Sequence, residues 1–203
     1  YHLTKALDSS RPVIGNDGWE SAATDIIGIH DYDDSPARIA GRYRVQHDVI
    51  AMLRQVRPAG RAITLPGHEH AGQPVVLSEF GGITYTPENR RDETWGYSRA
   101  DSPAELEADY TSLLEAVRQL ELLAGFCYTQ FADTYQEANG LLFADRTPKF
   151  PLDRIAAATR GVANGHQCDL GEEYELLMDE TSTARELADD SATRALHLTG
   201  FVC

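Results

Sequence analysis

The sequence predicts an α/β protein built on a parallel sheet. Short apolar runs alternate along the chain with longer amphipathic stretches, which is the pattern of successive βα units. The runs are rich in Val and Ile and are bounded by Gly and Pro, as expected for strands that are buried on both faces. Four such runs are present, and each ends in polar or aromatic residues. This is half the number of units in an eightfold (β/α) barrel, or TIM barrel.

The first part of the chain contains two of the expected strands. Residues 1–12 indicate the last turns of a helix and a turn, and "RPVIGNDGWE" (11–20) indicates a short strand and its loop. The next run, "TDIIGIHDYD" (24–33), indicates a second strand that ends in polar residues. Residues 36–57 place apolar side chains at helical spacing, with Pro36 suited to a first turn, and predict one crossover helix.

The second part contains the other two strands. The run "GQPVVLSEFGG" (72–82) indicates the third strand, and a polar loop follows over 83–101. A helix is expected next, because Ser102 is a suitable N-cap, Pro103 suits the first position and Glu105 lies three residues after the cap. The run "LAGFCYTQF" (123–131) indicates the fourth strand. Residues 151–164 indicate a last helix.

Glu79 is the first candidate functional residue. It follows directly on the apolar run of the third strand, so it is expected at that strand's carboxyl end. Ligands and catalytic side chains gather at this end of parallel strands in barrels and open α/β sheets. On this stretch alone, a solvated acid at the end of a strand is an equally simple interpretation.

Composition limits the possible partners. The 203 residues contain 18 Lys and Arg against 32 Asp and Glu, a net charge of −14, which would repel nucleic acid and anionic membrane surfaces. No apolar run approaches the length of a membrane span, and the start does not resemble a secretion signal. The three cysteines are far apart and suggest neither a disulfide framework nor a metal site. A cytoplasmic protein without membrane or nucleic-acid partners is therefore expected.

No cofactor or metal is expected. The "HEH" stretch, His68 to His70, lies in a Gly- and Pro-rich loop and lacks the helical i, i+4 spacing of a zinc protease. The sequence contains no nucleophile elbow, phosphate-binding loop or dinucleotide fingerprint. Cys127 lies inside an apolar strand and is expected to be buried rather than reactive.

The chain divides into two regions by composition. Residues 1–165 hold the expected βα units. Residues 166–203 form an acidic tail or the start of a further segment, because positions 169–203 carry nine acidic residues against two arginines.

Five stretches together carry a family resemblance: "LTKALDSSRPV", "DIIGIHDY", "PVVLSEFGG", "WGY" and "GFCYTQFADTYQEANGLLFADRTPK". In this order and at these separations they resemble the C-terminal half of the catalytic barrel of glycoside hydrolase family 2. The family includes β-galactosidases, β-glucuronidases and β-mannosidases. The resemblance covers residues 1 to about 160 and implies strands five to eight of a TIM barrel.

The resemblance implies a retaining β-glycosidase acting on carbohydrate substrates. Glu79 matches the family's nucleophile, and Tyr32 matches a tyrosine that donates to the nucleophile. Retaining hydrolysis also needs a second carboxyl group as acid/base, because one carboxylate cannot both attack and protonate. The family's Asn-Glu acid/base pair has no match in this sequence, so that residue is expected upstream of Tyr1.

Other residues at the expected rim are candidate substrate-binding residues. His30 and Asp31 follow the second strand, and each is equally compatible with a structural role. The indoles of Trp19 and Trp95 could stack on a sugar ring or anchor their loops. The strand-eight candidates are Gln130 and Asp133, where "YTQFAD" departs from the Trp-Asn-Phe-Ala-Asp-Phe pattern of some family members and leaves the sugar open. In "QEANG", Glu137 and Asn139 could cover the site or form a turn.

A non-catalytic carbohydrate-binding protein or a degenerate barrel remnant is the alternative function. The same aromatic rim would then bind sugar without hydrolysis. In either case four strands leave two open sheet edges, so the chain is expected to self-associate or to join a missing N-terminal half, and to be inactive alone.

Overall fold

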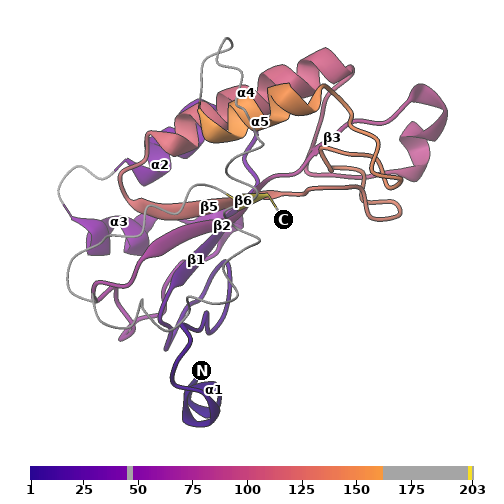
Figure 1. Ribbon diagram of the computed structural model, residues 1–203. Coiled ribbons are helices and arrows are strands. Elements are labelled where there is room, and N and C mark those ends of the chain that lie inside the picture. Colours follow the sequence, from indigo (N-terminus) through magenta and orange to yellow (C-terminus); the bar gives the residue numbers. More distant parts are fainter. Residues whose placement is uncertain (45–47, 162–200, 203) are drawn as a thin grey trace, which may run out of the picture.

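A parallel sheet forms the centre of the computed structural model, which describes residues 1–44, 48–161 and 201–202. The sheet has the order β1-β2-β5-β6, and each neighbouring pair is parallel. The strands are β1 (Ile27–Asp31), β2 (Val75–Gly81), β5 (Leu123–Thr129) and β6 (Phe201–Val202). The described strands alternate with helices and do not close into a barrel (Figure 1).

The main helices pack against one another over the sheet. They are α2 (Pro36–Tyr43), α4 (Pro103–Arg118) and α5 (Leu152–Arg160), and α4 contacts both of the others (Figure 1). On α4, Leu106, Tyr110 and Leu114 are fully buried, and the Tyr110 ring meets Tyr128 of β5 edge to face at 4.8 Å. Fully burying such a side chain contributes roughly 1.5–3 kcal/mol, so this layer holds the helices to the sheet.

The strands β1 and β2 are neighbours, and they bring two polar residues to adjacent positions near their carboxyl ends. In the β1–β2 ladder, Ile27 lies opposite Val75 and His30 lies opposite Glu79, with an irregularity after Gly28. The apolar side chains of Ile27 and Val75 are buried, whereas His30 and Glu79 are only partly buried. The register therefore brings His30 beside Glu79 near the carboxyl ends of the two strands.

The first expected strand, within residues 11–20, is wrong as a regular strand. This stretch runs beside β1, where the His30 N–H donates to the Gly18 carbonyl at 3.2 Å, but it forms no ladder. Gly18 and Glu20 have φ angles of 89° and 51°, which extended backbone does not allow. The three later strands are confirmed as β1, β2 and β5.

The single crossover helix expected over 36–57 is also wrong. The chain forms α2 and, separately, α3 (Val49–Gln55), with residues 45–47 outside the described part. The Asp48 carboxylate caps the second helix by accepting from the N–H groups of Ile50 and Ala51 at 2.9 and 3.1 Å. An N-cap of this kind starts a new helix. Asp48 therefore marks the start of α3, although the apolar spacing over 36–57 continues across it.

The other helix predictions are largely confirmed. The helix at the start is α1 (His2–Leu7), and α4 begins at Pro103, where Ser102 accepts from the Glu105 N–H at 3.1 Å. The last helix, expected over 151–164, ends earlier, at Arg160, because Gly161 adopts a left-handed conformation that terminates helices.

The polar loop over 83–101 is folded rather than extended into solvent. It contains β3 (Ile83–Thr84), η2 (Glu88–Glu93) and β4 (Ser98–Arg99), and β3 pairs with β4 in a separate small sheet. Another short helix, η1 (Pro58–Gly60), precedes β2. In Figure 1 the β3 segment extends away from the main sheet.

The remaining expectations concern the tail, the cysteines and the membrane. The boundary at 165 and nearly all of the acidic tail lie outside the described residues, except for β6. Cys127 is half-buried and disulfide-bonded, so the prediction of a buried residue without a disulfide is wrong. Within the described ranges, no helix has the length and apolar character needed to cross a bilayer.

Candidate functional site

The carboxylate of Glu79 is the centre of the candidate site. It lies two residues before the end of β2, and its side chain is 39% exposed. Its Oε2 atom accepts a hydrogen bond from the Tyr32 phenol and lies 3.2 Å from Nδ1 of His30. Both contacts are to the same oxygen. Among the hydrogen bonds of the described residues, none is donated to the other oxygen, Oε1.

Tyr32 follows β1 directly and reaches across to the neighbouring strand. Partial burial raises the pKa of its phenol far above the ordinary value, and the hydrogen bond to Glu79 raises it further, although Thr129 acts in the opposite direction. The phenol therefore remains a proton donor toward Glu79. A hydrogen bond from Tyr32 to Glu79 is what the family resemblance implies for the pair.

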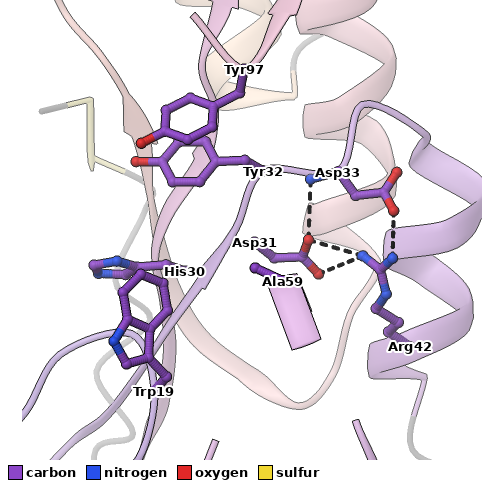
Figure 2. Close-up of a pocket in the computed structure, with 8 residues that line it drawn as sticks. All are labelled: Trp19, His30, Asp31, Tyr32, Asp33, Arg42, Ala59 and Tyr97. Atoms are coloured by element: carbon purple, nitrogen blue, oxygen red, sulfur yellow. Dashed lines mark hydrogen bonds and ion pairs between the residues drawn. The ribbon is translucent and has the colours of Figure 1, made fainter. Parts of the chain in front are cut away.

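Tyr97 supports Tyr32 from the other side. The two rings stack with centroids 3.4 Å apart and planes 7° apart, as Figure 2 shows. Gly82 makes this possible, because a Cβ atom there would lie 2.5 Å from the Tyr97 ring and 3.0 Å from the Tyr32 ring. The Tyr97 N–H also donates to the Gly82 carbonyl at 3.0 Å. The loop over 83–101 thus returns to the end of the sheet and fixes the ring that orients Glu79.

The His30 side chain is enclosed by residues from the irregular stretch before β1. Its Nε2 atom lies 3.2 Å from Oδ2 of Asp17, and the Trp19 ring meets it edge to face at 5.0 Å. The guanidinium of Arg61 lies over the Trp19 ring, 4.4 Å from the ring centroid. Trp19 therefore packs between two side chains with one edge toward the site.

A pocket of about 340 Å³ opens beside these groups. Its lining includes three aromatic residues and several polar ones, drawn together in Figure 2: Trp19, His30, Asp31, Tyr32, Asp33, Arg42, Ala59 and Tyr97. Aromatic walls with a few placed polar groups are typical of small-ligand sites, and they suit the apolar faces and hydroxyl groups of a sugar.

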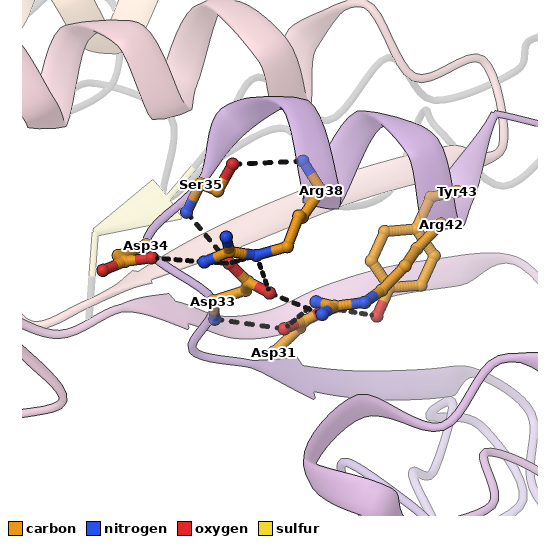
Figure 3. Close-up of polar contacts among 7 residues, drawn as sticks. All are labelled: Asp31, Asp33, Asp34, Ser35, Arg38, Arg42 and Tyr43. Atoms are coloured by element: carbon orange, nitrogen blue, oxygen red, sulfur yellow. Dashed lines mark hydrogen bonds and ion pairs between the residues drawn. The ribbon is translucent and has the colours of Figure 1, made fainter.

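Asp31 lines the pocket but is held by protein donors. The side chain is buried, and Figure 3 shows both oxygens occupied. Oδ1 and Oδ2 accept from Arg42 Nη1 at 2.9 and 2.8 Å, and Oδ2 accepts from the Tyr43 phenol at 2.7 Å. These contacts tie α2 to the end of β1.

Gln130 and Asp133 likewise have structural partners. The Gln130 amide donates to the side chain of Asn139 at 2.7 Å, and Asn139 is fully buried. Asp133 accepts from the ammonium of Lys149 at 2.7 Å and from the Gly140 N–H at 2.9 Å. These contacts hold the segment after β5 in its folded form.

Trp95 lies at the outer side of the same region. It is 49% exposed, and its ring meets that of Tyr97 edge to face at 6.0 Å. Its backbone pairs with the segment after β5, donating to the Gln136 carbonyl at 2.8 Å and forming a bridge with Glu137. The exposed indole therefore lies beside the Tyr32–Tyr97 stack, outside the lining of the pocket.

The "HEH" stretch shows no metal-binding arrangement. Glu69 of this stretch pairs with Arg54 instead. Across the part of the chain that the structure describes, no three His, Cys, Asp or Glu side chains are grouped as metal ligands would be.

Sequence reasoning did not single out Tyr97, Asp17 or Ser78 as site residues. Tyr97 lies fifteen residues beyond the end of the strand run, at a place set by the folding of a long loop. The "GNDGW" stretch around Asp17, with glycines on both sides, was the available signal for a carboxylate held close to the backbone.

Comparison with known protein families finds no family that matches the chain. A search of curated proteins also finds none with significant similarity.

Proposed function

We propose that this chain forms part of the catalytic domain of a retaining β-glycosidase resembling glycoside hydrolase family 2, with Glu79 as the nucleophile. The observation that carries the proposal is the state of the Glu79 carboxylate. Tyr32 and His30 both contact Oε2, and no described residue donates a hydrogen bond to Oε1 of this partly exposed side chain. A nucleophile of this kind has to be oriented by donors on one oxygen and open on the other.

In this reaction Oε1 of Glu79 attacks the anomeric carbon, and the bond to the aglycone oxygen breaks. The departing oxygen takes a proton from the acid/base, and water then hydrolyses the glycosyl ester and restores the carboxylate. Tyr32 orients the carboxylate before attack and donates to it again when its charge returns. The stacked Tyr32 and Tyr97 rings, with Trp19, form the wall against which the sugar lies.

The acid/base is proposed to come from outside the described residues. Asp17 is not suited to the role, because the His30 imidazole lies between it and Glu79, where the substrate would have to be. Asp31 and Asp133 are held by Arg42 and Lys149. The parallel strands with helices packed on them support the further proposal that this sheet belongs to a TIM barrel completed by other chain segments.

A carbohydrate-binding remnant without catalysis is the second candidate. The observation that favours it is that the described carboxylates near the pocket are engaged by protein partners, which leaves Glu79 without a catalytic partner among them.

Aryl glycosides distinguish the two candidates. The departure of 2,4-dinitrophenolate needs no proton, so attack by Glu79 can be observed without the acid/base. Without the acid/base the chain is expected not to turn over ordinary glycosides, but from a 2,4-dinitrophenyl β-glycoside of the right configuration we expect at least about one equivalent of dinitrophenolate per protein chain, and none from Glu79→Gln. Binding of the glycoside without release by the wild-type protein would favour the remnant and contradict the proposed nucleophile.

A further inference from the structure

The imidazole of His30 lies between two carboxylates. Nδ1 is 3.2 Å from Glu79 Oε2, and Nε2 is 3.2 Å from Asp17 Oδ2, while the side chain is only 12% exposed. An ionised carboxylate can only accept hydrogen bonds, so each nitrogen faces a group that favours an N–H donor. The ring therefore lies with one nitrogen toward the candidate nucleophile and the other toward Asp17.

Asp17 is itself held by the sheet. Its Oδ1 atom accepts from the Ser78 hydroxyl at 2.7 Å, and Ser78 is the residue before Glu79 on β2. Although partial burial acts to raise it, the pKa of Asp17 lies below its ordinary value, because the adjacent His30 ring and the hydrogen bond from the Ser78 hydroxyl favour the carboxylate. Asp17 thus remains an anion, fixed to the strand that carries Glu79.

Two glycines make room for this arrangement. A Cβ atom at Gly28 would lie 1.7 Å from Oδ1 of Asp17 and 2.8 Å from Oγ of Ser78. At Gly18, where φ is 89°, a Cβ atom would lie 2.5 Å from the His30 ring. The close approach of Asp17 to His30 therefore depends on the absence of side chains at both positions.

We propose that Asp17 is a positioning residue of the glycosidase site, which holds the His30 imidazole with Nδ1 directed at Oε2 of Glu79. This role rests on the function proposed above. The Asp17 carboxylate lies 3.2 Å from Nε2, on the side of the ring opposite Glu79, and this keeps Nδ1 turned toward Oε2 of Glu79. When Glu79 leaves the glycosyl ester and regains its charge, Tyr32 donates to that oxygen, and the His30 ring lies 3.2 Å from it on the other side.

Ring spectra of His30 test the positioning directly and need no activity. In the protein labelled with ¹⁵N-histidine, the His30 signals are assigned by their loss in His30→Gln. We expect Asp17→Asn to shift both ring nitrogen signals. Gly28→Ala should do the same, because its methyl group displaces the ends of two flexible side chains rather than backbone.

Asp8→Asn is the matched control. Asp8 also accepts from a serine hydroxyl, that of Ser10 at 2.5 Å, and also pairs with a cation, but it lies in the segment after α1 and does not contact His30. We expect this variant to leave the His30 signals unchanged. Identical His30 signals in wild type, Asp17→Asn and Gly28→Ala would overturn the proposal.

The reaction of Glu79 supplies the second readout. A panel of 2,4-dinitrophenyl 2-deoxy-2-fluoro-β-glycosides in gluco, galacto, manno and glucurono configuration is used to label the protein. With the sugar that labels wild type, we expect Asp17→Asn to lower the maximal labelling rate about 10-fold, the loss of one charge-assisted contact, with little change in the concentration for half-maximal rate. Asp8→Asn should label as wild type does.

The two proposals fail in different ways. A wild-type protein that no sugar of the panel labels contradicts the proposed function, and with it this role of Asp17. A wild-type protein that is labelled, with an Asp17→Asn variant that labels equally fast, contradicts the role of Asp17 alone.

Discussion

The phenol of Tyr32 donates a hydrogen bond to Oε2 of Glu79 across two neighbouring parallel strands. The donor is 47 residues away in sequence, and the stack with Tyr97 holds its ring in place. A carboxylate held in this way has one oxygen anchored and one available, and the proposed chemistry depends on that difference.

Tyr32→Phe should slow the labelling of Glu79 by about 10-fold while the fold is retained. The substitution removes the donor from Oε2 and keeps the ring that stacks on Tyr97, so the loss is that of one charge-assisted hydrogen bond. Stopped-flow release of dinitrophenolate measures the rate. Tyr135→Phe, at a residue that is 85% exposed, is the control. An unchanged rate in Tyr32→Phe would show that the phenol has no part in the reaction.

Asp31→Asn should reduce stability rather than ligand binding. Asp31 accepts from Arg42 and Tyr43 in a buried position, and loss of its charge should cost about 2–3 kcal/mol in the free energy of unfolding. Urea denaturation measures the change. Asp34→Asn removes a carboxylate that is 60% exposed and should cost less than about 0.5 kcal/mol.

A weaker affinity for glycosides in Asp31→Asn, with the free energy of unfolding unchanged, would show instead that Asp31 contacts the substrate.

The segment after β5 should depend on its buried ion pair. Lys149 is fully buried, and its ammonium donates to Asp133 and to the Ala138 carbonyl at 2.7 and 2.8 Å. Burial lowers the pKa of this ammonium, and Asp133 acts in the opposite direction. Lys149→Met should destabilise the protein by about 3 kcal/mol, because it leaves a buried carboxylate unpaired.

The double variant Asp133→Asn/Lys149→Met should be less destabilised than the sum of the two single variants. Chemical denaturation of all three measures the coupling. Additive effects would show that the pair does not act as a unit.

Asp33 should make a pH-dependent contribution to stability. The hydrogen bond from Arg38, with further donors at Ser35 and Arg42, lowers the pKa of this carboxyl to about 2. Its stabilising contribution is therefore fully present above the unfolded value of about 3.9 and is lost as the pH falls from there through about 2. After allowance for solvent screening, Asp33→Asn should cost about 1 kcal/mol at pH 7.

Denaturation curves of wild type and Asp33→Asn between pH 7 and pH 2 measure this contribution. The two curves should converge at the acidic end. A difference in stability that is independent of pH would show that the Asp33 charge is not its source.

The sequence predicted those parts of the fold that depend on local patterns. Apolar runs bounded by Gly and Pro located β1, β2 and β5, and the Ser102 cap located α4. The stretch before β1 was predicted to be a strand because it contains Val13 and Ile14. The positive φ angles of Gly18 and Glu20, which prevent a regular strand, cannot be recognised from a hydrophobic pattern. Likewise, the apolar spacing over 36–57 predicted one helix, whereas Asp48 caps a second helix within that range.

The candidate site could be predicted only where its residues lie at strand ends. Glu79 and Tyr32 both follow apolar runs, which placed them at strand ends, and their pairing was expected from the family resemblance. Gln130 and Asp133 also follow a strand, yet their side chains form hydrogen bonds with the segment that comes after them. A position at a strand end therefore does not by itself distinguish a residue of the candidate site from a structural one. Tyr97 reaches the site through a folded loop, which required tertiary structure to see.

The covalent label on the protein tests the central claim most directly. After inactivation by the 2-fluoro-glycoside that reacts, digestion and peptide mass spectrometry locate the modified residue. The account predicts a single fluoro-glycosyl ester on Glu79, in the peptide that contains "VVLSEFGG", and no label in Glu79→Gln. A label on any other carboxylate, or a Glu79→Gln variant that is labelled as wild type is, would contradict it.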